Sequence, residues 1–195
     1  MQYLETQTPL GTIIIAANPQ GLAGVWFNGQ KHFAGIAADW CKADSALLSE
    51  AEQQLHAYLQ DRLTQFNLPL APQGTAFQQH VWQALQSLAY GTTCSYGALA
   101  AAIAKPQAVR AVAAAIGKNP LSIIIPCHRV VGSQGQLTGY AGGLARKQWL
   151  LGLEKVDILP ALKGADSCCQ TLMSERENVL GGINISIMQR PTLRA

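Results

Sequence analysis

The sequence predicts an α/β protein in two parts, a small sheet-and-helix unit followed by a mostly helical unit. Strand-like runs broken by turn signals fill residues 3–27, whereas apolar residues at helical spacing recur between residues 77 and 153. The charge also changes sign: residues 1–75 hold three basic and six acidic side chains, and residues 76–155 hold seven basic side chains and one acid. We therefore expect an N-terminal α/β domain over residues 1–75, a mostly helical domain over residues 76–155 and a loosely ordered tail over residues 156–195.

The first part has the pattern of a β-meander followed by one helix. Pro9-Leu10-Gly11 and Asn18-Pro19-Gln20-Gly21 are turn signals between strand-like runs. Apolar side chains recur at helical spacing over residues 45–60, and Asp44 or Ser45 can cap the start of this helix. No catalytic constellation is visible in this part of the chain. The expected strands cover residues 3–6, 12–17, 22–27 and 66–70.

The second part contains two short helical patterns joined by a tight turn. Lys105-Pro106-Gln107 supplies the turn, and the outline is that of a helix-turn-helix. The helix after the turn is built mainly of Ala, Val and Ile, with Arg110 as its one long side chain. Small side chains let a backbone lie close to a nucleic-acid groove, but they are equally typical of a tightly packed core helix. The expected helices cover residues 77–88, 96–104, 108–118 and 144–153.

The basic charge of residues 76–155 favours a polyanionic partner, and nucleic acid is the commonest one. An ordinary solvated basic surface is the alternative. Glu154 is the only acid in this stretch, so we expect its carboxylate to be paired with a neighbouring group.

One cysteine stands in an unusual setting. Three β-branched residues, Ile123-Ile124-Ile125, predict a short buried strand, and Pro126 ends it because proline lacks a backbone donor. Cys127 follows directly, beside His128 and Arg129. Two potentially cationic neighbours are expected to lower the pKa of the thiol and to favour thiolate. The alternative is that Cys127 is a small buried hydrophobe, as most free cysteines are.

Several classes of protein are disfavoured by what the chain lacks. Five cysteines, an odd number at irregular spacing, do not suggest a disulfide framework, so a reducing cytoplasm is the expected compartment. No signal peptide and no apolar run of membrane-spanning length is present. Cys-x-x-Cys and His-x-x-x-His patterns are also missing, and we expect neither a metal nor another cofactor.

The second part contains a set of coupled motifs that is far more specific than Cys-His alone. The motifs are Asn119-Pro120, Pro126-Cys127-His128-Arg129-Val130, Gly139-Tyr140-Ala141-Gly142-Gly143 and Lys147-x-Trp149-Leu150-Leu151-x-x-Glu154. Over residues 77–154 this set resembles the O6-alkylguanine-DNA alkyltransferases, the methylated-DNA–protein-cysteine methyltransferase family. The resemblance implies a ribonuclease-H-like shape for the N-terminal domain and a winged-helix or helix-turn-helix-like shape for the C-terminal domain.

The resemblance also implies roles at the reacting centre. Cys127 is expected to accept the alkyl group, with His128 as a general base that acts through a water molecule. Glu154 is expected to orient His128 and to stabilise its charge, which is the nucleophile–base–orienter logic of other activated nucleophiles. Asn119 is expected to brace the turn that holds the thiol.

Further roles implied by the resemblance concern DNA. The helix that begins near residue 108 is expected to lie in the minor groove, with Ala111 and Ala114 on the DNA and Arg110 in the gap left by a flipped nucleotide. Tyr96 is expected to help rotate the nucleotide and to touch the base. The guanine pocket is expected to involve Tyr140 and the backbones of Val130 and Ala141.

The implied activity is DNA repair by direct alkyl transfer from O6-alkylguanine in double-stranded DNA, with O4-alkylthymine as a second candidate substrate. No cofactor is needed and no step regenerates the thiol, so each molecule, expected to be a monomer, reacts once. Two other interpretations stay open from the residues alone. One is a DNA-binding regulator without chemistry, and the other is a cysteine hydrolase with a Cys-His dyad, which would turn over repeatedly.

Overall fold

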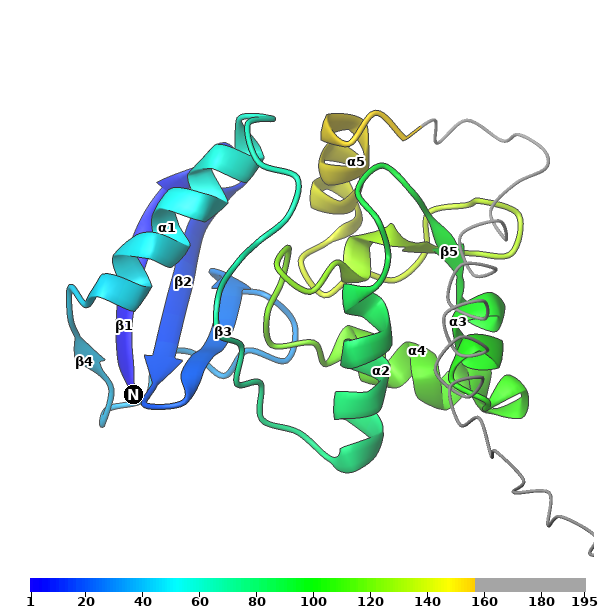
Figure 1. Cartoon of the computed structure of the whole chain (residues 1–195), viewed down its shortest axis with the longest axis horizontal. Helices are drawn as coiled ribbons and strands as arrows, with labels where there is room; N and C mark the ends of the chain where they lie inside the picture. Colours follow the sequence, from blue (N-terminus) through cyan, green and yellow to red (C-terminus); the bar gives the residue numbers. More distant parts are fainter. Residues whose placement is uncertain (157–195) are drawn as a thin grey trace, which may run out of the picture.

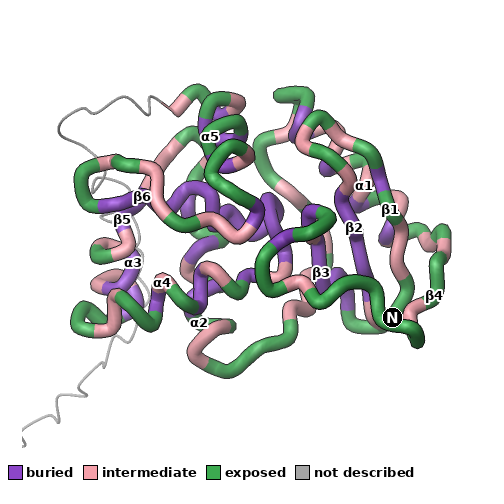
Figure 2. The backbone as a smooth tube through the Cα atoms, turned by 180° about the vertical axis from the view of Figure 1, so that it is seen from behind, coloured by how far each residue is buried: buried purple, intermediate pink, exposed green. Residues whose placement is uncertain are grey.

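The computed structural model describes residues 1–156. The expectations for the tail after residue 156, including the Cys168-Cys169 pair, lie outside the described residues. A sheet unit and a helical unit pack side by side in this part of the chain (Figure 1). Buried apolar side chains from both units form one continuous core, which appears as purple segments on both sides of the interface in Figure 2. Within these residues, no helix combines the length and the apolar character needed to cross a membrane.

The N-terminal sheet has the strand order β3-β2-β1-β4. The first three strands form an antiparallel meander, as predicted, and the short β4 strand pairs in parallel with β1. Strands β2 and β3 carry the buried part of the sheet: five consecutive residues of β2, from Ile13 to Ala17, are shielded from solvent, and in β3 only Trp26 is partly exposed. The strands are β1 (Gln2–Thr8), β2 (Gly11–Asn18), β3 (Gly21–Phe27) and β4 (Cys41–Lys42).

One helix, α1 (Ala46–Leu59), lies across the sheet (Figure 1). It begins where the sequence predicts, because the Ser45 side chain accepts a hydrogen bond from the backbone N–H of Leu48. Its apolar stripe is fully buried at Leu48, Leu55 and Tyr58. The last of these side chains reaches beyond the sheet towards the second unit.

The predicted strand over residues 66–70 is wrong. Only Leu70 pairs with the sheet, as an isolated parallel bridge to Leu22. The backbone N–H of Leu22 donates to the carbonyl of Pro69 (2.8 Å), and the N–H of Ala71 donates to the carbonyl of Leu22 (2.8 Å). Pro69 and Pro72 flank this contact and have no N–H, so the ladder cannot extend. The segment therefore runs as an irregular connection between the two units.

The C-terminal unit contains the four predicted helices and a two-stranded parallel pair that the sequence analysis missed. A capping box at Thr75 starts the first helix, and the Ser95 side chain caps the second. The second and third helices are joined by a single 3₁₀ turn at Pro106–Ala108. The elements are α2 (Ala76–Gln86), β5 (Cys94–Ser95), α3 (Tyr96–Ala102), α4 (Val109–Gly117), β6 (Val130–Val131) and α5 (Leu144–Leu153).

The predicted strand at Ile123-Ile124-Ile125 is a buried turn instead. Ile123 has a φ of 72°, and the N–H of Ile125 donates back to the carbonyl of Leu121 (2.9 Å), so the chain reverses direction. The sheet holds the entrance to the turn, because Val25 donates to the carbonyl of Pro120 and accepts from the N–H of Ser122. The β-branched run correctly indicated burial, but burial alone does not decide between a strand and a packed turn.

Candidate active site

Cys127 lies at the start of a one-turn 3₁₀ helix, Cys127–Arg129, that follows the buried turn. Its side chain is 5% exposed. The side-chain amide of Asn119 donates to the Cys127 Sγ (3.1 Å) and to the carbonyl of Ile125 (2.9 Å), while its Oδ1 accepts from the N–H of Leu121 (3.0 Å). Asn119 therefore fixes the turn and the thiol together, which is the geometry that its predicted bracing role requires.

The expected low pKa of the thiol is wrong. Burial raises the pKa of Cys127 above its ordinary value, and the hydrogen bond from Asn119 and the charge of Lys147 offset only part of this effect. Arg129 does not help, because its guanidinium is bound to Glu154. At neutral pH the resting thiol is therefore protonated, and its reaction as a nucleophile requires a base.

His128 is fully buried beside the thiol, and its Nε2 lies 2.8 Å from the Oε1 of Glu154. Burial lowers the pKa of His128, although the Glu154 carboxylate opposes this shift. A neutral imidazole next to a carboxylate must donate from Nε2, because the carboxylate can only accept. The lone pair is then on Nδ1, which is buried and has no hydrogen-bond partner within residues 1–156.

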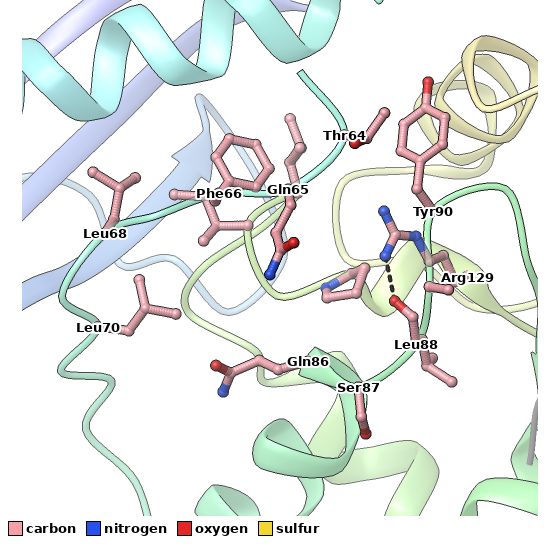
Figure 3. A pocket seen from close by; sticks show the side chains of 14 residues that line it. Thr64, Gln65, Phe66, Leu68, Leu70, Gln86, Ser87, Leu88, Tyr90 and Arg129 are labelled. Atoms are coloured by element: carbon pink, nitrogen blue, oxygen red, sulfur yellow. Dashed lines mark hydrogen bonds between the residues drawn. The ribbon is translucent and has the colours of Figure 1, made fainter. Parts of the chain in front are cut away.

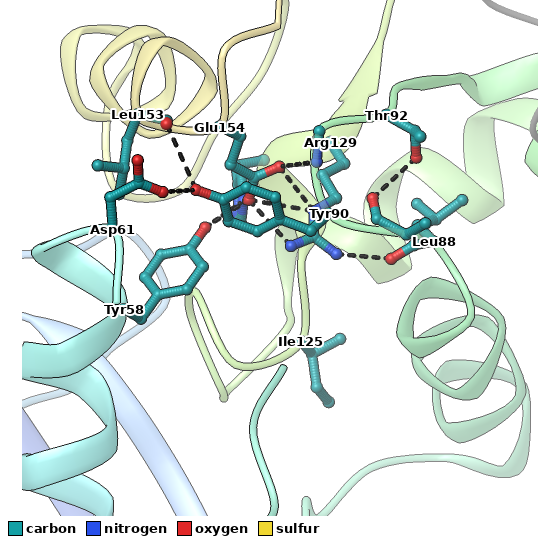
Figure 4. Close-up of polar contacts among 12 residues, drawn as sticks. Tyr58, Asp61, Leu88, Tyr90, Thr92, Ile125, Arg129, Leu153 and Glu154 are labelled. Carbon is teal, nitrogen blue, oxygen red and sulfur yellow. Dashed lines mark hydrogen bonds and ion pairs between the residues drawn. The ribbon is translucent and has the colours of Figure 1, made fainter. Parts of the chain in front are cut away.

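The Glu154 carboxylate, directly after α5, accepts hydrogen bonds from four residues (Figure 4). Arg129 donates from Nε to Oε2 (3.0 Å) and from Nη2 to Oε1 (2.9 Å), and the N–H of Gly91 donates to Oε2 (3.1 Å). His128 and the hydroxyl of Tyr58 donate to Oε1. Although burial alone would raise it, the bonds from His128 and Arg129 lower the pKa of Glu154 to about 2. The carboxylate is thus an anion whose hydrogen-bonding capacity is filled.

Three members of this cluster, Tyr58, Gly91 and Arg129, were not predicted as partners of Glu154 by the sequence analysis. Tyr58 is 96 residues away from Glu154 in the chain and has the apolar spacing of a core residue, so no local pattern could have identified it. Arg129 was assigned to the thiol because it is close in sequence. The partner of Arg129 could have been inferred from Glu154, the only acid of the basic segment, since a buried carboxylate requires a buried cation.

A cavity of about 430 Å³ lies between α4, the start of α3 and the segment 139–141, and Cys127 is not among the residues that line it. Tyr96 lies at its edge, where its hydroxyl donates to the carbonyl of Gly139 (3.2 Å). Val130 does not line this cavity, and its carbonyl instead accepts a hydrogen bond from the buried Lys147. Burial lowers the pKa of Lys147 to about 8. The lining includes the predicted residues Tyr96, Ala114, Tyr140 and Ala141, together with Lys31 and His32 from the sheet unit.

Helix α4 has two different faces: the inner face is packed as in a core helix, and the outer face is free for the predicted DNA contact. Ala115 packs inward, where its carbonyl accepts a hydrogen bond from the Trp82 indole (2.8 Å). Arg110, Ala111 and Ala114 are exposed on the outer face. The outer face combines a flat backbone surface with one long cation, as the predicted DNA contact requires.

A second cavity, of about 420 Å³, lies on the other side of the turn (Figure 3). The irregular connection at Thr64–Leu70 forms one wall, and Ile123, Ile124 and Pro126 form another. Arg129 closes it with a hydrogen bond to the carbonyl of Leu88, drawn as a dashed line in Figure 3. None of the predicted site residues lines this cavity, so the candidate substrate pocket is the first one.

The fold and the site define a class: a sheet unit and a helical unit that share one core, with a buried free cysteine in the same short turn as a histidine paired with a carboxylate. Comparison with known proteins is more specific. Residues 1–72 match the ribonuclease-like domain of 6-O-methylguanine DNA methyltransferase, and residues 76–156 match the DNA-binding domain of the same protein. The chain belongs to this family.

Relatives and solved structures agree with this assignment. A methylated-DNA–protein-cysteine methyltransferase of Methanosarcina barkeri is 47% identical over 155 residues, covering 80% of this chain and 98% of the relative. One of Mycobacterium leprae is 44% identical, over 80% of this chain and 93% of the relative. The Mycobacterium tuberculosis OGT structure in complex with DNA superposes with a TM-score of 0.74 at 40% identity, covering 87% of this chain and 99% of that one. The predicted family and fold class are confirmed.

Proposed function

We propose that the protein repairs DNA by transferring a methyl or other alkyl group from the O6 atom of alkylguanine to the Sγ of Cys127. The observation that carries the proposal is a buried thiol followed in the chain by a buried imidazole, whose Nδ1 has no hydrogen-bond partner within residues 1–156 while its Nε2 is fixed by Glu154. The names of the relatives, methylated-DNA–protein-cysteine methyltransferases, support the same reaction.

The chemistry is a displacement at the alkyl carbon. The thiol proton passes through a water molecule to the Nδ1 of His128, and the Sγ of Cys127 forms a bond to the alkyl carbon as the carbon–O6 bond breaks. The electron pair of that bond goes to the guanine O6, the base takes up a proton from water in exchange for the one that the thiol has given up, and the restored guanine stays in its DNA strand. Glu154 stabilises the imidazolium that forms. The thioether product is stable, so one protein molecule performs one reaction.

The alkyl carbon of O6-alkylguanine lies inside the duplex, so the nucleotide must leave the base stack to reach a buried thiol. The cavity lined by Tyr96, Tyr140 and Ala141 is large enough for a base, and two of its walls, Tyr96 and Tyr140, are close enough to Cys127 to interact with it electrostatically. The backbone of Val130 is kept as the proposed acceptor for the base, although its carbonyl is buried, accepts from Lys147 and lies outside this lining, so the base would have to reach beyond the cavity to use the second carbonyl lone pair.

Duplex DNA containing the alkylated guanine is the proposed partner, with α4 against its minor groove. Ala111 and Ala114 let the helix backbone approach, and Arg110 enters the stack in place of the flipped nucleotide. The basic charge of the surrounding segment attracts the phosphates without regard to sequence. One protein molecule per lesion is sufficient for this arrangement.

Intact-protein mass spectrometry after mixing with an oligonucleotide that contains one O6-methylguanine tests the proposal. We expect a mass gain of one methyl group, mapped to Cys127 by peptide analysis, and no gain in Cys127→Ser. A label on another cysteine with Cys127 unmodified contradicts the assignment. Repeated turnover would indicate a hydrolase, and unchanged function without Cys127 would indicate a regulator.

A further inference from the structure

Tyr58 is the contribution of the sheet unit to a cluster that otherwise belongs to the helical unit. It lies near the end of α1 and is fully buried. Its hydroxyl donates to the Oε1 of Glu154 and lies 3.3 Å from the Nε2 of His128 (Figure 4). The side chain therefore touches both the predicted base and the carboxylate that orients the base.

The tyrosine hydroxyl can act only as a donor towards this carboxylate. Burial raises the pKa of Tyr58, and the charge of Glu154 raises it further, so the phenol keeps its proton. Hydrogen bonds to a carboxylate withdraw negative charge from its oxygens. Because Tyr58 and His128 donate to the same atom, Oε1, each weakens the attraction of that atom for the proton of the other.

Apart from His128 itself, Tyr58 is the neutral side chain that donates to Glu154 in the described cluster, since Arg129 is charged and Gly91 donates from its backbone. Glu154 favours the imidazolium, whereas Arg129 and Lys147 oppose it. The titratable and charged groups that face His128 are Tyr58 of α1, Cys127 and Arg129 of its own turn, and Lys147 and Glu154 from α5 and its end. Removal of the Tyr58 hydroxyl changes this balance without changing a formal charge.

We propose that Tyr58 is a positioning residue that sets the basicity of His128 through Glu154, so that the N-terminal domain tunes the proton acceptor of the C-terminal domain. The inference rests on the proposed function, in which His128 takes the thiol proton. It adds a residue from the first domain, where the sequence shows no catalytic pattern.

The test is Tyr58→Phe, with two measurements. The first is the single-turnover rate of Cys127 alkylation by free O6-benzylguanine as a function of pH, which avoids any effect on DNA binding. The second is the pKa of His128 from imidazole NMR, which needs no alkyl transfer. Without the hydroxyl, more negative charge on Oε1 faces His128. We therefore expect both the acid limb of the rate profile and the NMR pKa to rise by about 0.5 to 1 pH unit.

Tyr90→Phe is the matched control. Its ring packs edge-on against Tyr58 at a centroid distance of 6.0 Å. Its hydroxyl, however, donates to Asp61 (2.9 Å) and to the carbonyl of Leu153 (3.3 Å) rather than to the carboxylate of Glu154. This variant is expected to lose a hydrogen bond and some stability while the acid limb stays in place.

A second variant keeps the test valid if Tyr58→Phe does not fold. Fluorinated tyrosine at position 58 retains the hydroxyl and makes it a stronger donor, so the NMR pKa of His128 should fall. A shift of opposite sign in the two variants supports the proposal. No shift in either variant, or equal shifts in Tyr58→Phe and Tyr90→Phe, overturns it. Failure of wild-type Cys127 to become alkylated overturns the proposed function instead, and the NMR titration still decides the role of Tyr58.

Discussion

The two sides of the turn at Cys127 differ in how completely their polar groups are satisfied. On the side of the cavity lined by Tyr96, Tyr140 and Ala141, space remains for a ligand, and the buried hydroxyl of Tyr140 has no hydrogen-bond partner among the described residues. On the other side, the Glu154 carboxylate is buried and filled by four donor residues. The comparison teaches that the proposed recognition side keeps free volume for a ligand. The hydrogen bonds around the Glu154 carboxylate, in contrast, are already formed without a ligand, as expected of a preorganised site.

Substitution on the filled side should slow the chemistry regardless of the substrate. Glu154→Gln removes the anion that stabilises the His128 imidazolium and leaves Arg129 without a charged partner. We expect the alkylation rate to fall by up to about 100- to 10,000-fold, equally for duplex DNA and for free O6-benzylguanine. Single-turnover rates on both substrates measure this effect. A loss confined to duplex DNA would place Glu154 on the recognition side.

The buried carboxylate of Glu154 should also control how the free energy of unfolding changes in acid. Bonds from His128 and Arg129, acting against burial, lower the pKa of Glu154 from 4.5 to about 2 in the folded state. A folded pKa below the unfolded one contributes stability that is present above about 4.5 and is lost as the pH falls towards about 2. This component amounts to roughly 3 kcal/mol. Denaturant titrations of wild type and Glu154→Gln should therefore converge on acidification, and parallel curves would contradict the assignment.

Substitution on the open side should separate the substrates. Arg110→Ala removes the side chain proposed to fill the gap in the base stack. In the wild type, filling this gap offsets part of the few kcal/mol that unstacking the base costs. We expect repair of duplex DNA to slow by about tenfold to a hundredfold, whereas the reaction with free O6-benzylguanine should hardly change. The ratio of the two second-order rate constants is the measurement. An unchanged ratio means that Arg110 is an ordinary surface residue.

Asn119 stands between the two sides, and its substitution should have the smallest effect on the alkylation rate among the substitutions considered. Asn119→Ala removes a donor to the Cys127 thiol, so the pKa of the thiol should rise further. We expect roughly a tenfold lower rate at neutral pH and a stability loss of about 1–3 kcal/mol from unpaired turn carbonyls. The rate should recover in alkaline solution, as measured with free O6-benzylguanine. A deficit independent of pH would limit Asn119 to holding the turn.

Local signals in the sequence predicted the elements well. The Ser95 cap and the apolar periodicity of residues 108–118 act over a few residues, so the sequence suffices to place α3 and α4. The motif set predicted the family, and with it the candidate residues around Cys127.

The errors concern properties that depend on distant parts of the chain. The pKa of Cys127 was misjudged because its burial, which the sequence pattern does not measure, outweighs its charged neighbours. Tyr58 was missed because its partner is provided by the other domain. The run at Ile123–Ile125 was assigned to a strand because a β-branched run indicates burial. It does not reveal whether a neighbouring strand is available to pair with it.

The contacts that hold the reactive turn also have a consequence for the order of folding. The hydroxyl of Ser122 donates to Gln30, a residue 92 positions earlier, and the N–H of Ser122 donates to the carbonyl of Val25. Contacts between distant positions form late, because the entropy of closing a long loop must be overcome first. We expect the meander to protect its amides early in refolding and the turn amides of Ser122 and Ile125 to become protected last. Pulsed hydrogen exchange would reveal this order. Such an order would mean that the thiol becomes reactive only once the sheet unit and the helical unit have both folded.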